Sequence, residues 1–257
     1  MTDVTRMADQ LIAAAAERRA LAEPFTAHEQ LDVERAYEVQ QAVVDGRLRA
    51  GSTIVGAKLG LTSRAKQRQM QVDEPLYGWL TSDMVLLGDE PLDLSRFIHA
   101  RAEPEIAFLL REQVDAPATT ATVLAATDSV FAAIEIIDSR YDAFRFGHAD
   151  VIADNASSAA VVLGSRPRSP EQLGDLRLCG CVLRVDGRIV STAAGAAALG
   201  HPATAVAWLI DQLHRRGQAL PAGSIVLSGA LTDAVALAPG ATVTAEFDGL
   251  GVVGVRA

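Results

Sequence analysis

The sequence predicts a mixed α+β protein with a substantially antiparallel sheet or barrel. Segments typical of strands occur in clusters, whereas segments typical of helices are concentrated at the N-terminus and at 202–217. Regular alternation of strands and helices, which would indicate a parallel sheet, is absent. The 257-residue chain also has no internal repeat and no long linker. We therefore predict one domain, 1–257, with a helical lobe at 1–50 and a β-rich core at 51–257.

Two amphipathic helices make up the predicted N-terminal lobe. Residues 5–23 are rich in helix formers and carry Met7, Leu11 and several alanines on one face. Asp32 is suited to cap a second helix, whose mostly apolar stripe continues until Gly51 stops it.

The β-rich part begins with a β-branched, glycine-spaced strand at 53–60, followed by a short helix at 63–70 and a turn at 73–78. Further strands are predicted by alternation or β-branched content at 84–87, 103–110, 131–137, 158–163, 181–185, 188–190, 224–227, 242–247 and 251–255. Asp186-Gly187 and Asp248-Gly249 are favoured two-residue hairpin turns. Pro202 suits the first turn of a helix that ends before Gly217.

Composition narrows the class of function. Hydrophobic residues make up 49% and charged residues 21% of the chain, which excludes a disordered protein. A net charge of -9 without any Lys/Arg run argues against binding to duplex nucleic acid. The first residues lack the pattern of a signal peptide, and no segment has the length and apolarity of a membrane span. The two cysteines, Cys179 and Cys181, are expected to be packing residues, so we expect a cytoplasmic protein that acts on a small molecule.

Three glutamates in predicted strands form the first candidate site. Glu103 and Glu105 are two residues apart and share one face of a strand, and Glu135 lies in an otherwise apolar run. A buried ionised carboxylate is costly unless a cation or hydrogen bonds compensate it. Arg101 or Arg140 could do so in a purely structural pair. Alternatively, three strand carboxylates suit Mg²⁺ or Mn²⁺, which prefer oxygen ligands, and these residues alone leave both interpretations open.

Lysine usage indicates a further candidate. Of 23 basic residues only Lys58 and Lys66 are lysines. Burial can shift the pKa of an ammonium group, which a guanidinium does not offer. Lys66 lies in a polar run and is expected to be solvated. Lys58 lies in the glycine-spaced strand and is the better candidate for transferring a proton or anchoring a substrate.

The remaining motifs are ambiguous or absent. The run 151–158 places Asp154, Asn155, Ser157 and Ser158 between apolar segments, which is equally typical of an Asx turn. The five histidines show no spacing typical of metal ligands. Without a G-x-S-x-G, Walker or G-x-G-x-x-G motif, the serine hydrolase, nucleotidase and Rossmann dehydrogenase classes lack their main support.

Eight motifs in order resemble the family of 2-keto-4-pentenoate hydratases and 4-oxalocrotonate decarboxylases, part of the fumarylacetoacetate hydrolase superfamily. They are GAKLGLTS at Gly56, VDEPLYG at Val72, AEPEIAFLL at Ala102, AIEIIDSRYDAFRF at Ala133, ADNASS at Ala153, AGAAALGHP at Ala194, PAGSIVLSGALT at Pro221 and FDGLG at Phe247. The likeness covers nearly the whole chain. It implies a mixed β-roll core with flanking helices, and an oligomeric assembly.

The resemblance also implies the site. The metal ligands of the family fall on Glu103, Glu105 and Glu135, its acid/base or substrate-binding lysine falls on Lys58, and substrate-binding positions fall on Asn155, Ser157 and Ser228. The implied cofactor is Mg²⁺ or Mn²⁺.

Leu76 favours one branch of this family. Hydratases commonly carry an acidic residue at this position of the D-x-P-D-[FY]-G loop, where it helps to deliver water, whereas decarboxylase-like sequences carry an apolar one. The resemblance therefore implies a carboxy-lyase of aromatic meta-cleavage catabolism, which converts 2-oxohex-3-enedioate (4-oxalocrotonate) into 2-oxopent-4-enoate or 2-hydroxypenta-2,4-dienoate and CO₂.

Two alternatives to this activity remain. The first is a hydratase that converts 2-hydroxypenta-2,4-dienoate into 4-hydroxy-2-oxopentanoate at the same metal site. The second is a non-catalytic subunit that stabilises another enzyme of the pathway. The resemblance implies a homo-oligomer, alone or in complex with a related hydratase or decarboxylase subunit.

Overall fold

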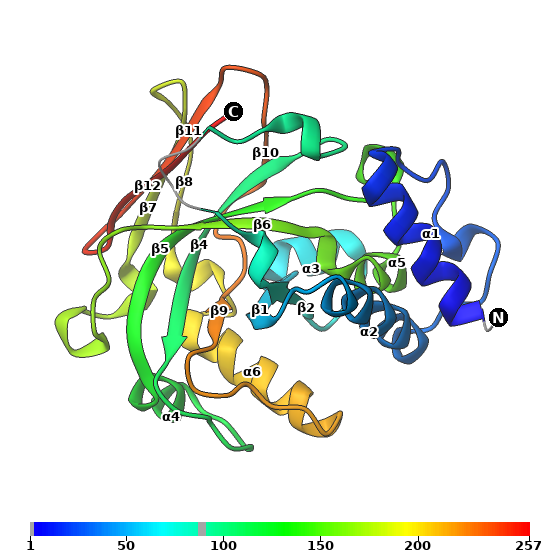
Figure 1. Cartoon of the computed structure of the whole chain (residues 1–257). Helices are drawn as coiled ribbons and strands as arrows, with labels where there is room; N and C mark the ends of the chain where they lie inside the picture. Colours follow the sequence, from blue (N-terminus) through cyan, green and yellow to red (C-terminus); the bar gives the residue numbers. More distant parts are fainter. Residues whose placement is uncertain (1–2, 87–90) are drawn as a thin grey trace.

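A strongly curved sheet of eight strands forms the centre of the computed structural model, which describes residues 3–86 and 91–257 (Figure 1). In spatial order its strands are β2 (Leu76–Thr81), β1 (Ile54–Gly60), β9 (Ile225–Leu227), β4 (Arg101–Leu110), β5 (Thr127–Ile137), β6 (Ser158–Leu163) and β3 (Val85–Leu86), and β10 (Val235–Ala236) pairs with β4. The pairs β1–β9 and β3–β6 are parallel and the others are antiparallel. The predicted fold class, mixed and largely antiparallel, is confirmed.

A second, antiparallel sheet covers one face of the first. Its strands are β12 (Gly251–Arg256), β11 (Thr242–Phe247), β7 (Gly180–Val185) and β8 (Arg188–Ala194), in this order. Strands β11 and β12 lie against β5, and the apolar side chains between the two sheets form the largest core cluster. Burial of this cluster is the main source of stability here, because apolar burial yields roughly 25 cal/mol per Å².

The helices form two groups around the large sheet (Figure 1). Helices α1 (Asp3–Glu17), α2 (Val33–Arg49) and α5 (His148–Ala153) pack together over a second apolar cluster, which includes Met7, Leu11 and Val39. On the face that the second sheet covers, α6 (Pro202–Arg215) packs against α4 (Thr120–Ala125) and β1, and α3 (Arg64–Met70) follows β1 in the chain. Of the helices that the structure describes, none has both the length and the apolar character needed to cross a membrane.

Several predicted boundaries differ from the structure: β5 begins at Thr127 and not at 131, and β8 runs to Ala194 and not to 190. Helix α1 ends at Glu17 and not near 23, because Arg18 has a left-handed backbone (φ 52°) and Leu21 pairs with Tyr141. The predicted turn at 73–78 holds only for its first half, since Leu76 already pairs with β1 at the start of β2. The predicted strand at 84–87 corresponds to β3, and residue 87 lies outside the described residues.

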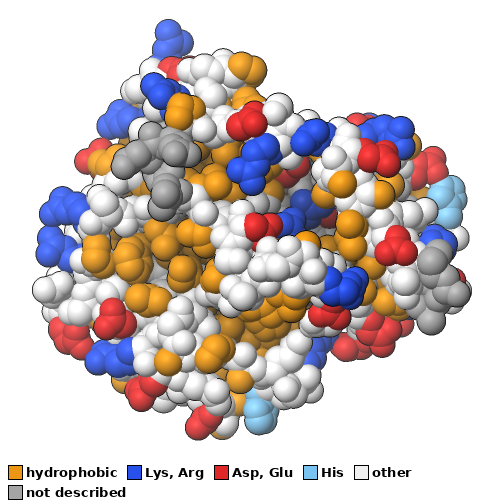
Figure 2. Space-filling view, in the orientation of Figure 1, with side chains coloured by type: hydrophobic (Ala, Val, Ile, Leu, Met, Phe, Trp, Pro, Cys, Tyr) orange, Lys and Arg blue, Asp and Glu red, His pale blue; other side chains and the backbone are white. Residues whose placement is uncertain are grey.

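Alternation along β4 decides where the polar residues of the large sheet point. Ile106 and Phe108 join the core between the sheets. Glu103 and Glu105 lie on the opposite, concave face, which continues into a small apolar cluster through Ala107. Acidic and basic side chains are interspersed over the molecular face in Figure 2.

Candidate active site

Three carboxylates converge on the concave face of the large sheet. The register of β4 and β5 places Glu103 opposite Glu135, and Glu105 follows two residues later on the same face. One carboxylate oxygen of each residue lies within 4.8 Å of the others. Glu105 and Glu135 are fully buried, whereas Glu103 is 8% exposed and borders a cavity.

The surroundings of these carboxylates fit a hard divalent cation. Burial, reinforced by the charge of Glu135, raises the pKa of Glu105 well above its ordinary value, and burial likewise raises the pKa of Glu135. Glu105 Oε2 accepts a hydrogen bond from the Gly229 N–H at 2.6 Å. The Oε1 atoms of both residues are buried and have no hydrogen-bond partner among the described residues. Unpaired buried oxygens are rare, and oxygen atoms of this kind are the ligands that Mg²⁺ and Mn²⁺ prefer.

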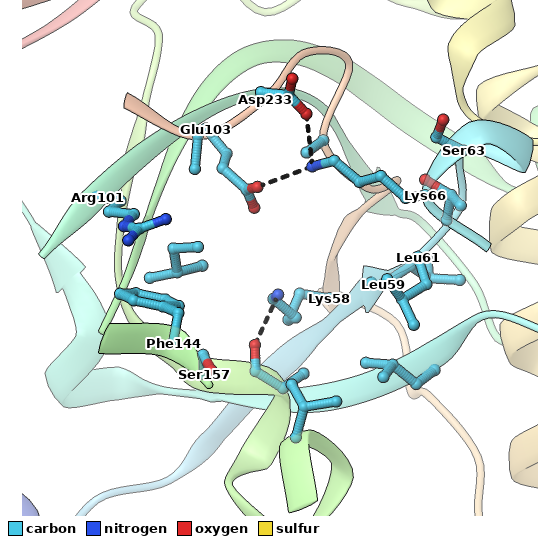
Figure 3. A pocket seen from close by; sticks show the side chains of 18 of the residues that line it. Lys58, Leu59, Leu61, Ser63, Lys66, Arg101, Glu103, Phe144, Ser157 and Asp233 are labelled. Atoms are coloured by element: carbon cyan, nitrogen blue, oxygen red, sulfur yellow. Dashed lines mark hydrogen bonds and ion pairs between the residues drawn. The ribbon is translucent and has the colours of Figure 1, made fainter. Parts of the chain in front are cut away.

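Lys58 lies beside the three glutamates, on β1. Its Nζ is 2.9 Å from Glu135 Oε2 and donates a hydrogen bond to the Ala156 carbonyl at 3.0 Å. Burial lowers the pKa of this lysine, but the charges of Glu135 and Glu105 outweigh that effect and hold the pKa above its ordinary value. Lys58 is therefore a buried, charged ammonium with a fixed position beside Glu135. Figure 3 shows it in the same cavity as Glu103.

The prediction that Lys66 is a solvated helix residue holds only in part, because its side chain is 27% exposed and ion-paired. Its Nζ lies 3.3 Å from Glu103 Oε1, donates to the Thr232 carbonyl at 3.3 Å and lies 3.8 Å from Asp233 (Figure 3). Both lysines of the chain are thus ion-paired with a glutamate of the same cluster. The polar run around Lys66 does not predict this ion pair, because the partners of Lys66 are distant in the sequence.

The arginines considered as structural partners of the glutamates have other contacts. Arg140 forms a buried ion pair with Asp154. The guanidinium of Arg101 stacks on the Phe144 ring, 4.1 Å from its centroid. The structure therefore contradicts an arginine–glutamate pair as the reason for these carboxylates.

A cavity of about 340 Å³ opens beside Lys58 and Glu103 (Figure 3). Its volume suits a small organic acid. The apolar part of its wall consists of Leu59, Leu61, Leu76, Ile137, Phe144, Phe146 and Val151. The predicted catalytic residue Leu76 is 1% exposed, so it closes this wall without reaching bulk solvent.

The predicted substrate-binding residues fall at different depths. Ser157 lines the cavity, and its hydroxyl donates a hydrogen bond to Asp154 at 3.3 Å. Asn155 and Ser228 are buried behind the wall. The N–H of Ser228 donates a hydrogen bond to the Ile106 carbonyl on β4. The next residue, Gly229, donates its N–H to Glu105.

A strained turn connects this wall to β2. Asn155, Ala156 and Ser157 all have left-handed backbones, with φ of 51°, 55° and 56°. The Asn155 side chain accepts from the Trp79 N–H at 2.8 Å and donates to the Trp79 carbonyl at 2.9 Å. A Cβ at Gly78 would lie 2.5 Å from the Asn155 carbonyl oxygen, so only glycine permits this approach. The turn thereby presents the Ala156 carbonyl to Lys58.

Replacing Asn155 with alanine is expected to destabilise the fold by about 2–4 kcal/mol, because both backbone groups of Trp79 lose a buried partner. Urea denaturation measures this change in the free energy of unfolding. Ser157→Ala, which removes one longer hydrogen bond, is the matched control and should cost less than about 1.5 kcal/mol. Equal stability of Asn155→Ala and the wild type would contradict the proposed role of the side chain.

Comparisons with known proteins show the family to which the chain belongs. Residues 52–256 match the family described as fumarylacetoacetate (FAA) hydrolase C-terminal. The chain belongs to this family. The resemblance to the fumarylacetoacetate hydrolase superfamily that the sequence motifs indicated is therefore confirmed.

Relatives with two different activities are similarly close. A 4-oxalocrotonate decarboxylase from a Pseudomonas species is 40% identical over 248 residues, covering 96% of this chain and 95% of the relative. A 2-keto-4-pentenoate hydratase from Burkholderia vietnamiensis is 43% identical over 223 residues, covering 86% and 85%. Both are lyases, and identity alone does not separate the two activities.

A solved relative supports the fold and the type of cofactor. The 4-oxalocrotonate decarboxylase from Pseudomonas putida, in complex with magnesium and adipate, superposes with a TM-score of 0.95 at 37% identity. The superposition covers 100% of this chain and 98% of that chain. The magnesium in that complex agrees with the oxygen-rich site described above.

Proposed function

We propose that this chain is a metal-dependent decarboxylase that releases CO₂ from 2-oxohex-3-enedioate. The observation that carries the proposal is the trio of buried glutamates beside Lys58, at a small cavity whose wall includes apolar Leu76. Glu103, Glu105 and Glu135 would hold Mg²⁺ or Mn²⁺. The proposal includes a homo-oligomeric, cytoplasmic enzyme that acts alone or together with a related hydratase or decarboxylase subunit.

The substrate is a vinylogous β-keto acid, which determines what the site must do. When the C5–C6 bond breaks, CO₂ leaves and its electron pair forms a C4=C5 double bond. The C3=C4 pair shifts to C2=C3, which places the negative charge of the resulting dienolate on the 2-oxo oxygen. A divalent cation held by Glu103, Glu105 and Glu135 would supply Lewis-acid chemistry at this end of the substrate. Because negative charge grows at that end in the transition state, positive charge there lowers the barrier.

The remaining steps fall to side chains of this chain. Lys58 carries a proton at Nζ and is oriented by Glu135 and the Ala156 carbonyl, so it can protonate the dienolate as a general acid. The apolar wall excludes water, which strengthens the electrostatic interactions and prevents addition to the diene.

Leu76→Asp is expected to raise the ratio of hydrated to non-hydrated product severalfold, because a carboxylate at this wall can orient a water molecule. Product ratios measured by NMR after complete turnover check this outcome. Leu76→Met keeps the wall apolar and serves as the control. Product ratios that do not change in Leu76→Asp would count against a role of this residue in excluding water.

Hydration of 2-hydroxypenta-2,4-dienoate is the second candidate, favoured by the 43% identical hydratase. Incubating the purified protein and Mg²⁺ with 2-oxohex-3-enedioate, and separately with the dienoate, distinguishes the two. The proposal predicts CO₂ from the first substrate, lost on adding EDTA, and little 4-hydroxy-2-oxopentanoate from the second. Hydration without CO₂ release would support the hydratase, and no turnover of either substrate would support a non-catalytic subunit.

A further inference from the structure

Arg101 is a cation of the cavity wall whose guanidinium has no carboxylate partner within residues 3–86 and 91–257. It is half-buried, lines the cavity and lies to one side of Glu103 (Figure 3). The two lysines of the cavity are ion-paired with Glu135 and Glu103, respectively. An arginine that is partly withdrawn from water and free of a counter-ion is well suited to bind a carboxylate in a bidentate manner.

Its position on β4 relates Arg101 to the candidate metal ligands. Residues 101, 103 and 105 share one face of the strand, so Arg101 lies in one row with the two glutamates, at the start of β4. Two residues of a strand span about 7 Å. In an extended six-carbon diacid, the second carboxylate carbon lies about 5 Å from the 2-oxo carbon, with bonds of about 1.5 Å. A diacid with its 2-oxo end at the glutamates therefore reaches the side of the cavity that Arg101 occupies.

The guanidinium is held in place by an aromatic ring. The Phe144 ring lies under its face, and the His99 ring lies 4.8 Å from Phe144 on centroids. Ala143 and Phe144 both have left-handed backbones, φ 52° and 56°, a conformation that bulky residues rarely adopt and that is often found at functional sites. Stacking occupies the face of the guanidinium and leaves its N–H edge available to a ligand.

We propose that Arg101 binds the second carboxylate of a dicarboxylic 2-oxo acid and makes the site select diacids over monoacids. The proposal rests on the proposed function, since it takes the 2-oxo end of the substrate to lie at the three glutamates. Charge leaves the second carboxylate during the reaction, so a cation there stabilises the bound substrate more than the transition state. Arg101 is therefore a specificity residue that acts on binding.

Titration calorimetry with non-reacting ligands tests this role. The probes are 2-oxohexanedioate and 2-oxohexanoate, which share the 2-oxo acid end, differ in the second carboxylate and lack the double bond needed for CO₂ release. In the presence of Mg²⁺, the wild type should bind the diacid at least about tenfold more tightly, the value expected for a charged hydrogen-bonded pair. Arg101→Met should reduce this ratio to below about twofold by weakening only the diacid.

Lys66→Met is the matched control, because it removes the other half-buried cation of the cavity wall and should preserve the ratio. Thermal unfolding and Mg²⁺ titration show whether each variant is folded and binds metal. The proposal is overturned if the wild type does not prefer the diacid or binds neither acid. It is also overturned if Arg101→Met keeps the preference for the diacid or binds both acids equally more weakly. Loss of the preference in Lys66→Met would overturn it as well. Neither probe reacts, so this binding measurement does not depend on the CO₂-release assay. The outcome of the binding test and that of the proposed function can therefore be distinguished.

Discussion

Glu105→Gln is expected to abolish Mg²⁺ binding and to lower kcat/KM by about a thousandfold or more, the range seen when a main electrostatic stabiliser is lost. The amide oxygen can still accept the Gly229 N–H, so the local hydrogen bond survives. Burial raises the pKa of Glu105, which means that its ionised form is costly without a cation. The metal-free variant should therefore be as stable as the metal-free wild type, or more stable.

Calorimetric Mg²⁺ titration, steady-state kinetics and urea unfolding in EDTA measure the expected changes in metal binding, kcat/KM and stability, respectively. Glu246→Gln removes the same charge from an exposed position on β11 and serves as the control. Wild-type Mg²⁺ affinity in Glu105→Gln would contradict its assignment as a ligand. If the variant does not unfold cooperatively, Glu103→Gln at the cavity edge provides the same test with less disturbance of buried contacts.

Lys58→Met is expected to lower kcat by about 10²–10⁴-fold while Mg²⁺ affinity is kept or increased. The first effect follows because the dienolate loses its proton donor. The second follows because a positive charge disappears from beside the ligands, 2.9 Å from Glu135. In EDTA the variant should be less stable by about 3–5 kcal/mol, since Glu135 loses its buried partner, and Mg²⁺ should restore much of this loss.

Steady-state kinetics with a parallel Mg²⁺ titration separates the role of Lys58 from metal binding. Lys58→Arg should not restore activity, because a guanidinium does not release its proton. Lys66→Met removes the chain's other lysine from a partly exposed pair and should lower kcat by less than about tenfold. A Lys58→Met variant that loses activity only in proportion to lost Mg²⁺ would contradict a role in proton transfer.

Strand periodicity made the central part of the site predictable. Residues two apart share a strand face, so Glu103 and Glu105 had to point the same way in any sheet. Glu135 in an apolar run indicated a buried carboxylate that needs a cation. The pairing of Glu103 with Glu135 across β4 and β5 is a matter of register, which the sequence does not specify without the partner strands.

Other parts of the site depend on contacts between distant segments. Lys66 lies in a polar run, and its partial burial results from contacts with Thr232 and Glu103, which are distant in the sequence. The left-handed turn at 155–157 requires the close approach of Gly78 and the backbone of Trp79. Local sequence predicts an Asx turn there and gives no reason for three consecutive left-handed residues.

Anomalous diffraction from crystals soaked with Mn²⁺ would locate a bound cation. We expect one strong manganese peak on the concave face of the large sheet, about 2 Å from a carboxylate oxygen of each of Glu103, Glu105 and Glu135. A cation found elsewhere, or an empty glutamate trio at a Mn²⁺ concentration that supports turnover, would contradict this expectation.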